Sequence, residues 1–120
     1  MHTLNVLVVE DVAPLRRLMK ALLQRRDGVN VRAVGTVKEA LAQLEEWSPD
    51  GALVDRTLPD GRGEQVLHAL AEKHPQAVRV LMTGDRVSPE TELPLPGVTV
   101  LQKPFTAEAL GRWINTLRSG

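Results

Sequence analysis

Cysteine is absent from the sequence, so disulfide bonds and thiolate metal sites are excluded. Aromatic residues are scarce, because Trp47, Phe105 and Trp113 are the only three, and single-stranded nucleic acid needs more rings for base stacking. An excess of charge is also missing, since 15 basic residues balance 15 acidic ones. With no net charge, the chain has no general attraction to nucleic acid or to an anionic membrane.

Long apolar runs and targeting signals are missing too. No apolar run approaches the roughly 18 residues of a membrane span. Residues 1–5 lack the basic start and apolar core of a signal peptide, and no Walker A or GxGxxG motif supports nucleotide binding. The composition, with 42% hydrophobic and 25% charged residues, is that of a globular protein. We therefore expect one domain over residues 1–120 and a cytoplasmic location.

Five short apolar runs predict β-strands, because buried strands consist of apolar residues bounded by turn residues. They cover residues 6–9, 29–33, 52–55, 78–82 and 98–101. In the second run apolar and polar residues alternate, which predicts a half-exposed strand at the edge of a sheet.

Segments with apolar residues at helical spacing follow the first, second, third and fifth runs. The first includes Leu15, Leu18 and Met19 on one predicted face, with Pro14 in the first helical turn. Thr36 and Glu39 form a capping-box pattern for the second helix, and Thr106 is predicted to cap the last. Strands that alternate with helices predict an α/β fold with a parallel sheet covered on both faces.

The segment from residue 86 to residue 97 differs from the others. It contains Pro89, Pro94 and Pro96, which leave room for at most a turn or two of helix. We therefore expect the helix after the fourth strand to be short or irregular.

Chemically capable residues follow four of the five predicted strands. Glu10 and Asp11 follow the first, Asp55 ends the third, Thr83 follows the fourth, and Lys103 follows the fifth. The carboxyl ends of parallel strands lie at one rim of the sheet, where ligands of open α/β sheets bind. Three carboxylates there repel one another, and oxygen ligands of this kind favour Mg²⁺ or Mn²⁺. Together with a lysine and a hydroxyl group, the set suits phosphoryl transfer.

The ordered set resembles the receiver domain of two-component response regulators, over essentially all 120 residues. Its parts are Glu10-Asp11 after Val-Leu-Val-Val, Asp55 with Pro59 four residues on, Thr83-Gly84 after a strand, and Lys103-Pro104-Phe105. The resemblance implies a flavodoxin-like (βα)5 three-layer sandwich with strand order 2-1-3-4-5.

The resemblance also implies a metal site. Asp11 is expected to ligate Mg²⁺ directly, and Glu10 through a water molecule. Asp55 and the backbone carbonyl of Thr57 complete the protein ligands expected from the family.

The phosphoacceptor implied by the resemblance is Asp55, which attacks a phosphohistidine on a histidine kinase or histidine phosphotransfer domain. Lys103 is expected to pair with the phosphoryl oxygens, and Thr83 to donate its hydroxyl to them. On this interpretation the protein is a signalling domain that assists its own phosphorylation and autodephosphorylation, not an enzyme. We expect a monomer or a weak dimer that binds neither nucleic acid nor a membrane.

Several positions depart from the family pattern. Val100 stands where many receivers have an aromatic switch residue, and Arg56 is an unusual long cation beside the acceptor. Asp85, two residues past Thr83, is expected to influence access of the attacking water. The short proline-containing segment and Leu-Gln-Lys-Pro-Phe resemble receivers of hybrid sensor histidine kinases.

Two other functions remain open at this point. The chain could be a degenerate receiver that only binds proteins, or a small Mg²⁺-dependent phosphatase that uses an aspartyl nucleophile. Phosphatases of the haloacid-dehalogenase type carry a second acid two residues after the nucleophile, where this chain has Thr57. Arg16, Arg17 and Lys20 on the first helix suit either a solvated face or an acidic partner.

Overall fold

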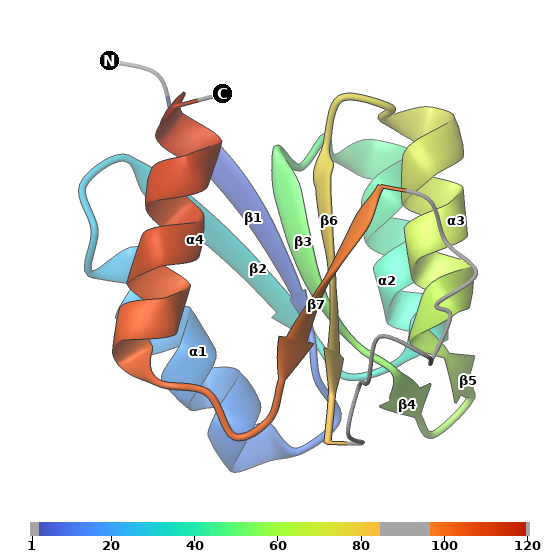
Figure 1. Ribbon diagram of the computed structural model, residues 1–120. Coiled ribbons are helices and arrows are strands. Elements are labelled where there is room, and N and C mark those ends of the chain that lie inside the picture. The colour runs from blue at the N-terminus through green and yellow to red at the C-terminus, as the bar shows by residue number, and fades with distance from the viewer. Residues whose placement is uncertain (1–2, 85–96, 120) are drawn as a thin grey trace.

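A computed structural model describes residues 3–84 and 97–119 of the chain (Figure 1). Within these residues, one five-stranded parallel sheet has the order β2-β1-β3-β6-β7. Its strands are β1 (Leu4–Val9), β2 (Val29–Val34), β3 (Gly51–Asp55), β6 (Val78–Thr83) and β7 (Val98–Gln102). Counted along the chain, these strands have the predicted order 2-1-3-4-5, and the flavodoxin-like topology is confirmed.

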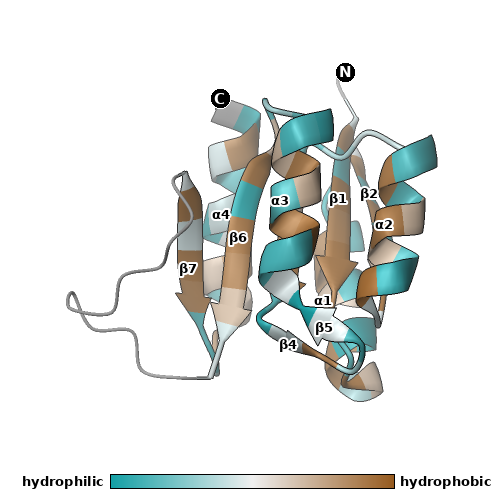
Figure 2. Cartoon of the chain, turned by 90° about the vertical axis from the view of Figure 1, so that its right-hand side faces the viewer, coloured by the Kyte–Doolittle hydropathy of each residue, from teal (hydrophilic) through white to brown (hydrophobic). Residues whose placement is uncertain are grey.

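Helices cover both faces of the sheet and complete the predicted three layers (Figure 1). The helices α1 (Ala13–Gln24) and α4 (Ala107–Ser119) lie on one face, and α2 (Val37–Glu46) and α3 (Gly63–Lys73) lie on the other. Each face has its own hydrophobic core, so the central strands are buried on both sides. Figure 2 shows the hydrophobic strands behind the polar outer sides of α2 and α3. The irregular helix predicted within residues 86–97 lies outside the described residues up to residue 96, as does Asp85.

The helix-start signals at Pro14, Thr36 and Thr106 are confirmed, but the Glu39 carboxylate accepts from the Thr36 hydroxyl instead of completing the predicted capping box at the Thr36 N–H. Pro14 lies in the first turn of α1, where its missing N–H group costs nothing. The Thr36 hydroxyl accepts a hydrogen bond from the Glu39 N–H at 3.0 Å, and Thr106 accepts one from the Ala109 N–H at 3.1 Å. Within the described part of the chain, no helix combines the length and hydropathy that crossing a membrane requires.

The predicted apolar face of α1 was wrong at Leu18, which is 54% exposed. The buried side of α1 is centred on Met19 and Leu23. Successive helical residues are about 100° apart, so Leu18 lies at the border of the apolar stripe rather than at its centre. Spacing alone does not distinguish the centre of such a stripe from its border.

The stretch after β3 was predicted as a loop and instead contains a small antiparallel hairpin. Its strands are β4 (Thr57–Leu58) and β5 (Gly61–Arg62), joined by the turn at Pro59 and Asp60. Leu58 is 5% exposed and belongs to the core on the α2 and α3 face, which anchors the hairpin to the domain.

Gly63, the first residue of α3, lies directly against the end of β3. A Cβ atom at this position would stand 2.1 Å from the backbone oxygen of Asp55. The Gly63 N–H also donates to the Arg56 carbonyl at 2.9 Å. Because no side chain fits between them, α3 begins within contact distance of the strand end that carries Asp55.

We predict that Gly63→Ala lowers the free energy of unfolding by about 1–3 kcal/mol, the usual effect of overpacking a close contact. Gly84→Ala is the matched control, because nothing lies within 4 Å of a Cβ atom placed there. Urea denaturation of both variants measures the difference, and equal stabilities would show that the approach of α3 is not tight.

Candidate metal centre

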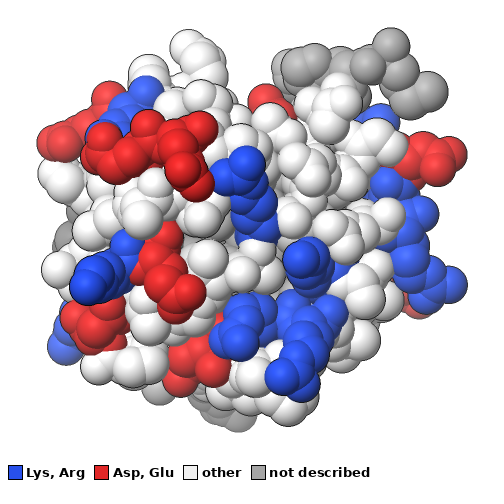
Figure 3. Space-filling view, turned by 180° about the vertical axis from the view of Figure 1, so that it is seen from behind, with Lys and Arg blue, Asp and Glu red and all other residues white. Residues whose placement is uncertain are grey.

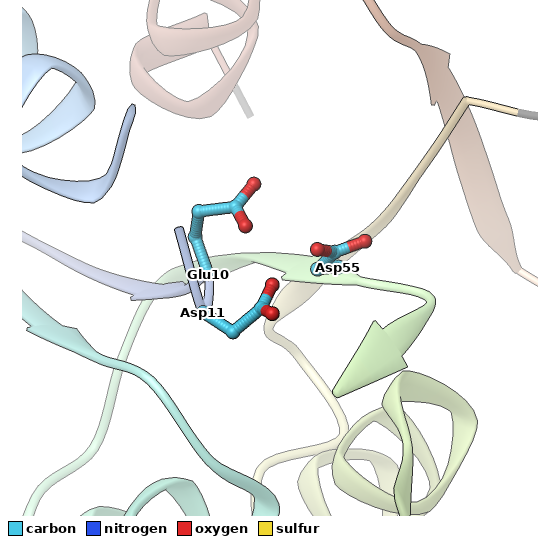
Figure 4. Close-up of side chains that lie close together, drawn as sticks. All are labelled: Glu10, Asp11 and Asp55. Carbon is cyan, nitrogen blue, oxygen red and sulfur yellow. The ribbon is translucent and has the colours of Figure 1, made fainter. Parts of the chain in front are cut away.

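Three carboxylates meet at the carboxyl ends of β1 and β3 (Figure 4). Oxygen atoms of Glu10, Asp11 and Asp55 all lie within 4.8 Å of one another. The register explains this, because Val9 pairs with Val54, so Glu10, which directly follows β1, comes level with Asp55, the last residue of β3. The predicted meeting of these acids at one rim is confirmed, and the group could hold a metal ion.

The three acids differ in burial. Glu10 is 0% exposed and Asp55 is 9% exposed, whereas Asp11 lies at the surface. Burial raises the pKa of Glu10 above its usual value, and the nearby Asp55 adds to this. Hydrogen bonds from Lys103 and from the Val12 N–H, the latter at 3.1 Å, act in the opposite direction. The hydrogen bonds from Lys103 and Val12 therefore favour the ionised form of Glu10, which burial disfavours.

Lys103 supplies the positive charge of the centre. Its ammonium donates to Glu10 Oε1 and to Asp55 Oδ2, the latter at 3.3 Å. Burial alone would lower the pKa of Lys103, but the hydrogen bond and charge of Glu10, with the charge of Asp55, raise it above the usual value. Lys103 therefore remains an ammonium that faces two carboxylates.

Thr83 and Thr57 both lie near Asp55. Asp55 pairs with Met82 in the sheet, so the neighbouring Thr83, which is 3% exposed, ends its strand close to Asp55. The Thr83 carbonyl accepts from the Lys103 N–H at 2.8 Å, which joins β6 to the residue that carries the ammonium. The Thr57 N–H donates to Asp55 Oδ1 at 3.4 Å. All the predicted site residues are thus in one region.

Arg56, the residue after Asp55, contacts an acid of the next helix. Its Nε atom is 3.7 Å from Glu64 Oε2, in the first turn of α3. The Arg56 N–H donates to the Met82 carbonyl at 2.8 Å. The Arg56 side chain thus contacts α3, and its backbone joins the end of β3 to β6.

Arg16 has a role in the centre that the sequence did not indicate. Its Nη1 atom donates to the backbone carbonyls of Glu10, at 3.0 Å, and of Asp11, at 3.4 Å. A Cβ atom on Gly35 would lie 2.8 Å from the same Nη1, so glycine leaves the room for the guanidinium. The long side chain reaches back from α1, a contact that the sequence pattern does not encode.

Arg17 and Lys20 are exposed, unlike Arg16. The surface view from behind shows basic side chains gathered toward the side of α1 and acidic ones toward the side of α2 and α3 (Figure 3). The balanced net charge therefore conceals an uneven distribution.

Comparison with known proteins agrees with this geometry. The family model "Response regulator receiver domain" matches residues 6–115. The chain belongs to this family. Receiver domains are signalling domains that accept phosphoryl groups, bind Mg²⁺ at an acidic pocket, and interact with histidine kinases or phosphotransfer proteins.

Among curated proteins, the luminescence regulatory protein LuxO of Vibrio campbellii is 37% identical over 77 residues, which are 64% of this chain and 17% of LuxO. The transcriptional regulatory protein DpiA of Escherichia coli K12 is 30% identical over 118 residues, covering 96% of this chain and 52% of DpiA. The chain thus spans only part of the length of these relatives.

Among solved structures, the receiver domain of the hybrid histidine kinase CckA is 25% identical, with a TM-score of 0.79. The match covers 94% of this chain and 97% of the CckA chain.

We predict that Mg²⁺ stabilises the protein through Asp11. At about 100 times the dissociation constant, a ligand that binds only the folded state adds about 2.7 kcal/mol to the free energy of unfolding. Asp11→Asn should lose most of this gain, and without metal it should be at least as stable as the wild type, because repulsion between the carboxylates falls.

Thermal unfolding with and without Mg²⁺ measures both effects. Asp27→Asn, which changes an exposed acid at the end of the loop after α1, is the control. The same Mg²⁺-induced shift in Asp11→Asn and in the wild type would exclude this residue as a ligand.

Proposed function

We propose that this receiver domain takes a phosphoryl group onto Asp55 from a phosphohistidine of a histidine kinase or histidine phosphotransfer domain, and then changes conformation. The reaction requires Mg²⁺, or Mn²⁺ in its place. The observation that supports this most is the convergence of Glu10, Asp11, Asp55 and the Lys103 ammonium at one rim of the sheet.

The metal site of this proposal consists of Asp11, Asp55 and the Thr57 backbone carbonyl, with Glu10 bound through water. The close set of carboxylate oxygens fits a hard divalent cation, which prefers oxygen ligands. Such an ion offsets negative charge on phosphoryl oxygens during transfer.

Asp55 is the nucleophile of the reaction. One of its carboxylate oxygens forms a bond to phosphorus while the bond from phosphorus to the imidazole nitrogen breaks, and the imidazole keeps the electron pair. One phosphoryl group thus moves from the imidazole nitrogen to Asp55, and no atom changes its oxidation state. The carboxylate is held in place by the Thr57 N–H and by Lys103, at 3.4 Å and 3.3 Å.

Lys103 and Thr83 stabilise the product in this proposal. The raised pKa keeps Lys103 charged, so its ammonium can pair with the phosphoryl oxygens, and the buried Thr83 is placed to donate its hydroxyl. Because Val100 is not aromatic, the change of conformation cannot depend on an aromatic side chain at that position. The same groups assist autodephosphorylation.

Apolar side chains beside the centre suit the approach of a partner. Val12 is 51% exposed and Leu18 is 54% exposed. A hollow of about 260 Å³ is lined by Leu15, from the same helix as Leu18, and by Lys103, Pro104 and Phe105. Exposed apolar side chains near a hollow are typical of a surface that binds another protein. This surface fits a partner that brings a phosphohistidine to the rim.

The remaining parts of the proposal concern the setting of the domain. We place it in the cytoplasm on the family resemblance, as a monomer or weak dimer that works without direct contact to nucleic acid. The balanced net charge supports the last of these points.

Asp55→Asn tests the proposal, and it should abolish labelling by acetyl phosphate or by a phosphorylated phosphotransfer domain in the presence of Mg²⁺. Intact-protein mass spectrometry should show one added phosphoryl group on the wild type and on the Asp27→Asn control. Removal of Mg²⁺ with EDTA should suppress it.

The possible results separate the three functions. Full labelling of Asp55→Asn would contradict the choice of acceptor. A wild type that no donor labels would indicate a degenerate receiver that only binds proteins. Repeated hydrolysis of small phosphate esters would indicate the phosphatase.

We further predict that Lys103→Met slows phosphorylation of Asp55 by about 100-fold, the usual loss when one preorganised donor is removed from a developing charge. Lys73→Met, at the far end of α3, is the control. Stopped-flow or quench-flow kinetics with acetyl phosphate measure the rates at a temperature where circular dichroism shows each variant folded. A rate within a factor of two of the wild type would exclude the role of Lys103.

A further inference from the structure

The hairpin of β4 and β5 connects the acceptor strand to α3. Its first residue, Thr57, comes two residues after Asp55 and pairs with Arg62. Thr57 is exposed, so burial of its own side chain does not hold it in place. Its position depends on what fastens the hairpin to the rest of the domain.

Asp60, in the turn of this hairpin, bonds to the start of a different helix. Its Oδ1 atom accepts from the Val37 N–H at 2.8 Å, and its Oδ2 atom accepts from the Lys38 N–H at 3.0 Å. These are the first two residues of α2, whose N–H groups have no partner within the helix. These two hydrogen bonds lower the pKa of Asp60 below its usual value, and the bond from the Lys38 N–H has the larger effect. We call this pair of bonds the Asp60 cap.

The helix α2 has an N-cap of its own and does not need the Asp60 cap in order to begin. Thr36, the residue before the helix, already accepts from the Glu39 N–H. A single N-cap residue is the usual arrangement. The second cap comes from a segment more than 20 residues away in sequence, so its added effect is to join the hairpin to α2.

Other contacts hold the hairpin on its α3 side. Gln65 Oε1 accepts from the Arg62 N–H at 2.8 Å, and the buried Leu58 packs into the core. A Cβ atom on Gly61 would lie 3.3 Å from a methyl group of Val37, so the turn also approaches α2 closely. On the α2 side, the Asp60 cap is the polar contact that orients the turn.

We propose that Asp60 is a positioning residue for the phosphoacceptor loop: by joining the hairpin to the start of α2, it holds the Thr57 carbonyl where the metal ion is bound. This inference rests on the metal site of the proposed function. It makes α2 part of the support of the centre, although α2 supplies none of the proposed ligands.

Two variants that remove one cap of the same helix test the inference. Asp60→Ala removes the link from the hairpin, whereas Thr36→Ala removes the helix's own cap and leaves the hairpin link intact. Asp60→Asn keeps one oxygen acceptor and should give an intermediate result. Each protein is studied at a temperature where it is fully folded.

Amide hydrogen exchange of residues 57–62 other than Pro59, measured by NMR without metal, should be at least about 10-fold faster in Asp60→Ala than in the wild type or Thr36→Ala. Calorimetric titration with Mg²⁺ should show affinity about 10-fold weaker in Asp60→Ala, the size of effect usual for residues that orient ligands. Thr36→Ala should remain within a factor of two of the wild type.

Equal effects of Asp60→Ala and Thr36→Ala on both measurements would reduce Asp60 to a simple helix cap and overturn the inference. If the wild type itself binds no Mg²⁺, the proposed function fails and the metal part of the inference with it. The exchange rates would still decide whether Asp60 fastens the hairpin. The two failures are therefore distinguishable.

Discussion

The ion pair between Glu10 and Lys103 is the interaction on which the centre depends. Glu10 is fully buried next to Asp55, and an isolated carboxylate in that position would be costly to ionise. The Lys103 ammonium bonds to both acids and offsets this cost. Asp11 stays in solvent, where its charge is less costly. The result is a rim that carries more negative than positive charge and suits a divalent cation.

The surrounding fold turns this pair into a centre of defined shape. Parallel register brings the ends of β1 and β3 level, and Gly63 lets α3 begin against the backbone of Asp55. Arg16 holds the two carbonyls that follow β1. In the hairpin that follows Asp55, Asp60 joins the turn to α2. Several of these supports come from residues that bear no part in the proposed chemistry.

The elements predicted from the sequence correspond closely to the structure, because buried strands and amphipathic helices have strong local patterns. The strand that ends at Asp55, the cap at Thr36 and the edge position of β2 are examples. The failures have a common cause. The exposure of Leu18 depends on the direction in which α1 faces the sheet, and the hairpin at Leu58 depends on a core that only the folded chain contains.

The sequence by itself determined which residues could meet, because the position of a polar residue after an apolar run decides its place at the carboxyl rim of a parallel sheet. Glu10, Asp55 and Lys103 belong to this class. Only the tertiary structure decided how they are held. The contacts of Arg16 and Asp60 join segments whose separation in sequence carries no periodic signal, and long side chains make them in directions that packing sets.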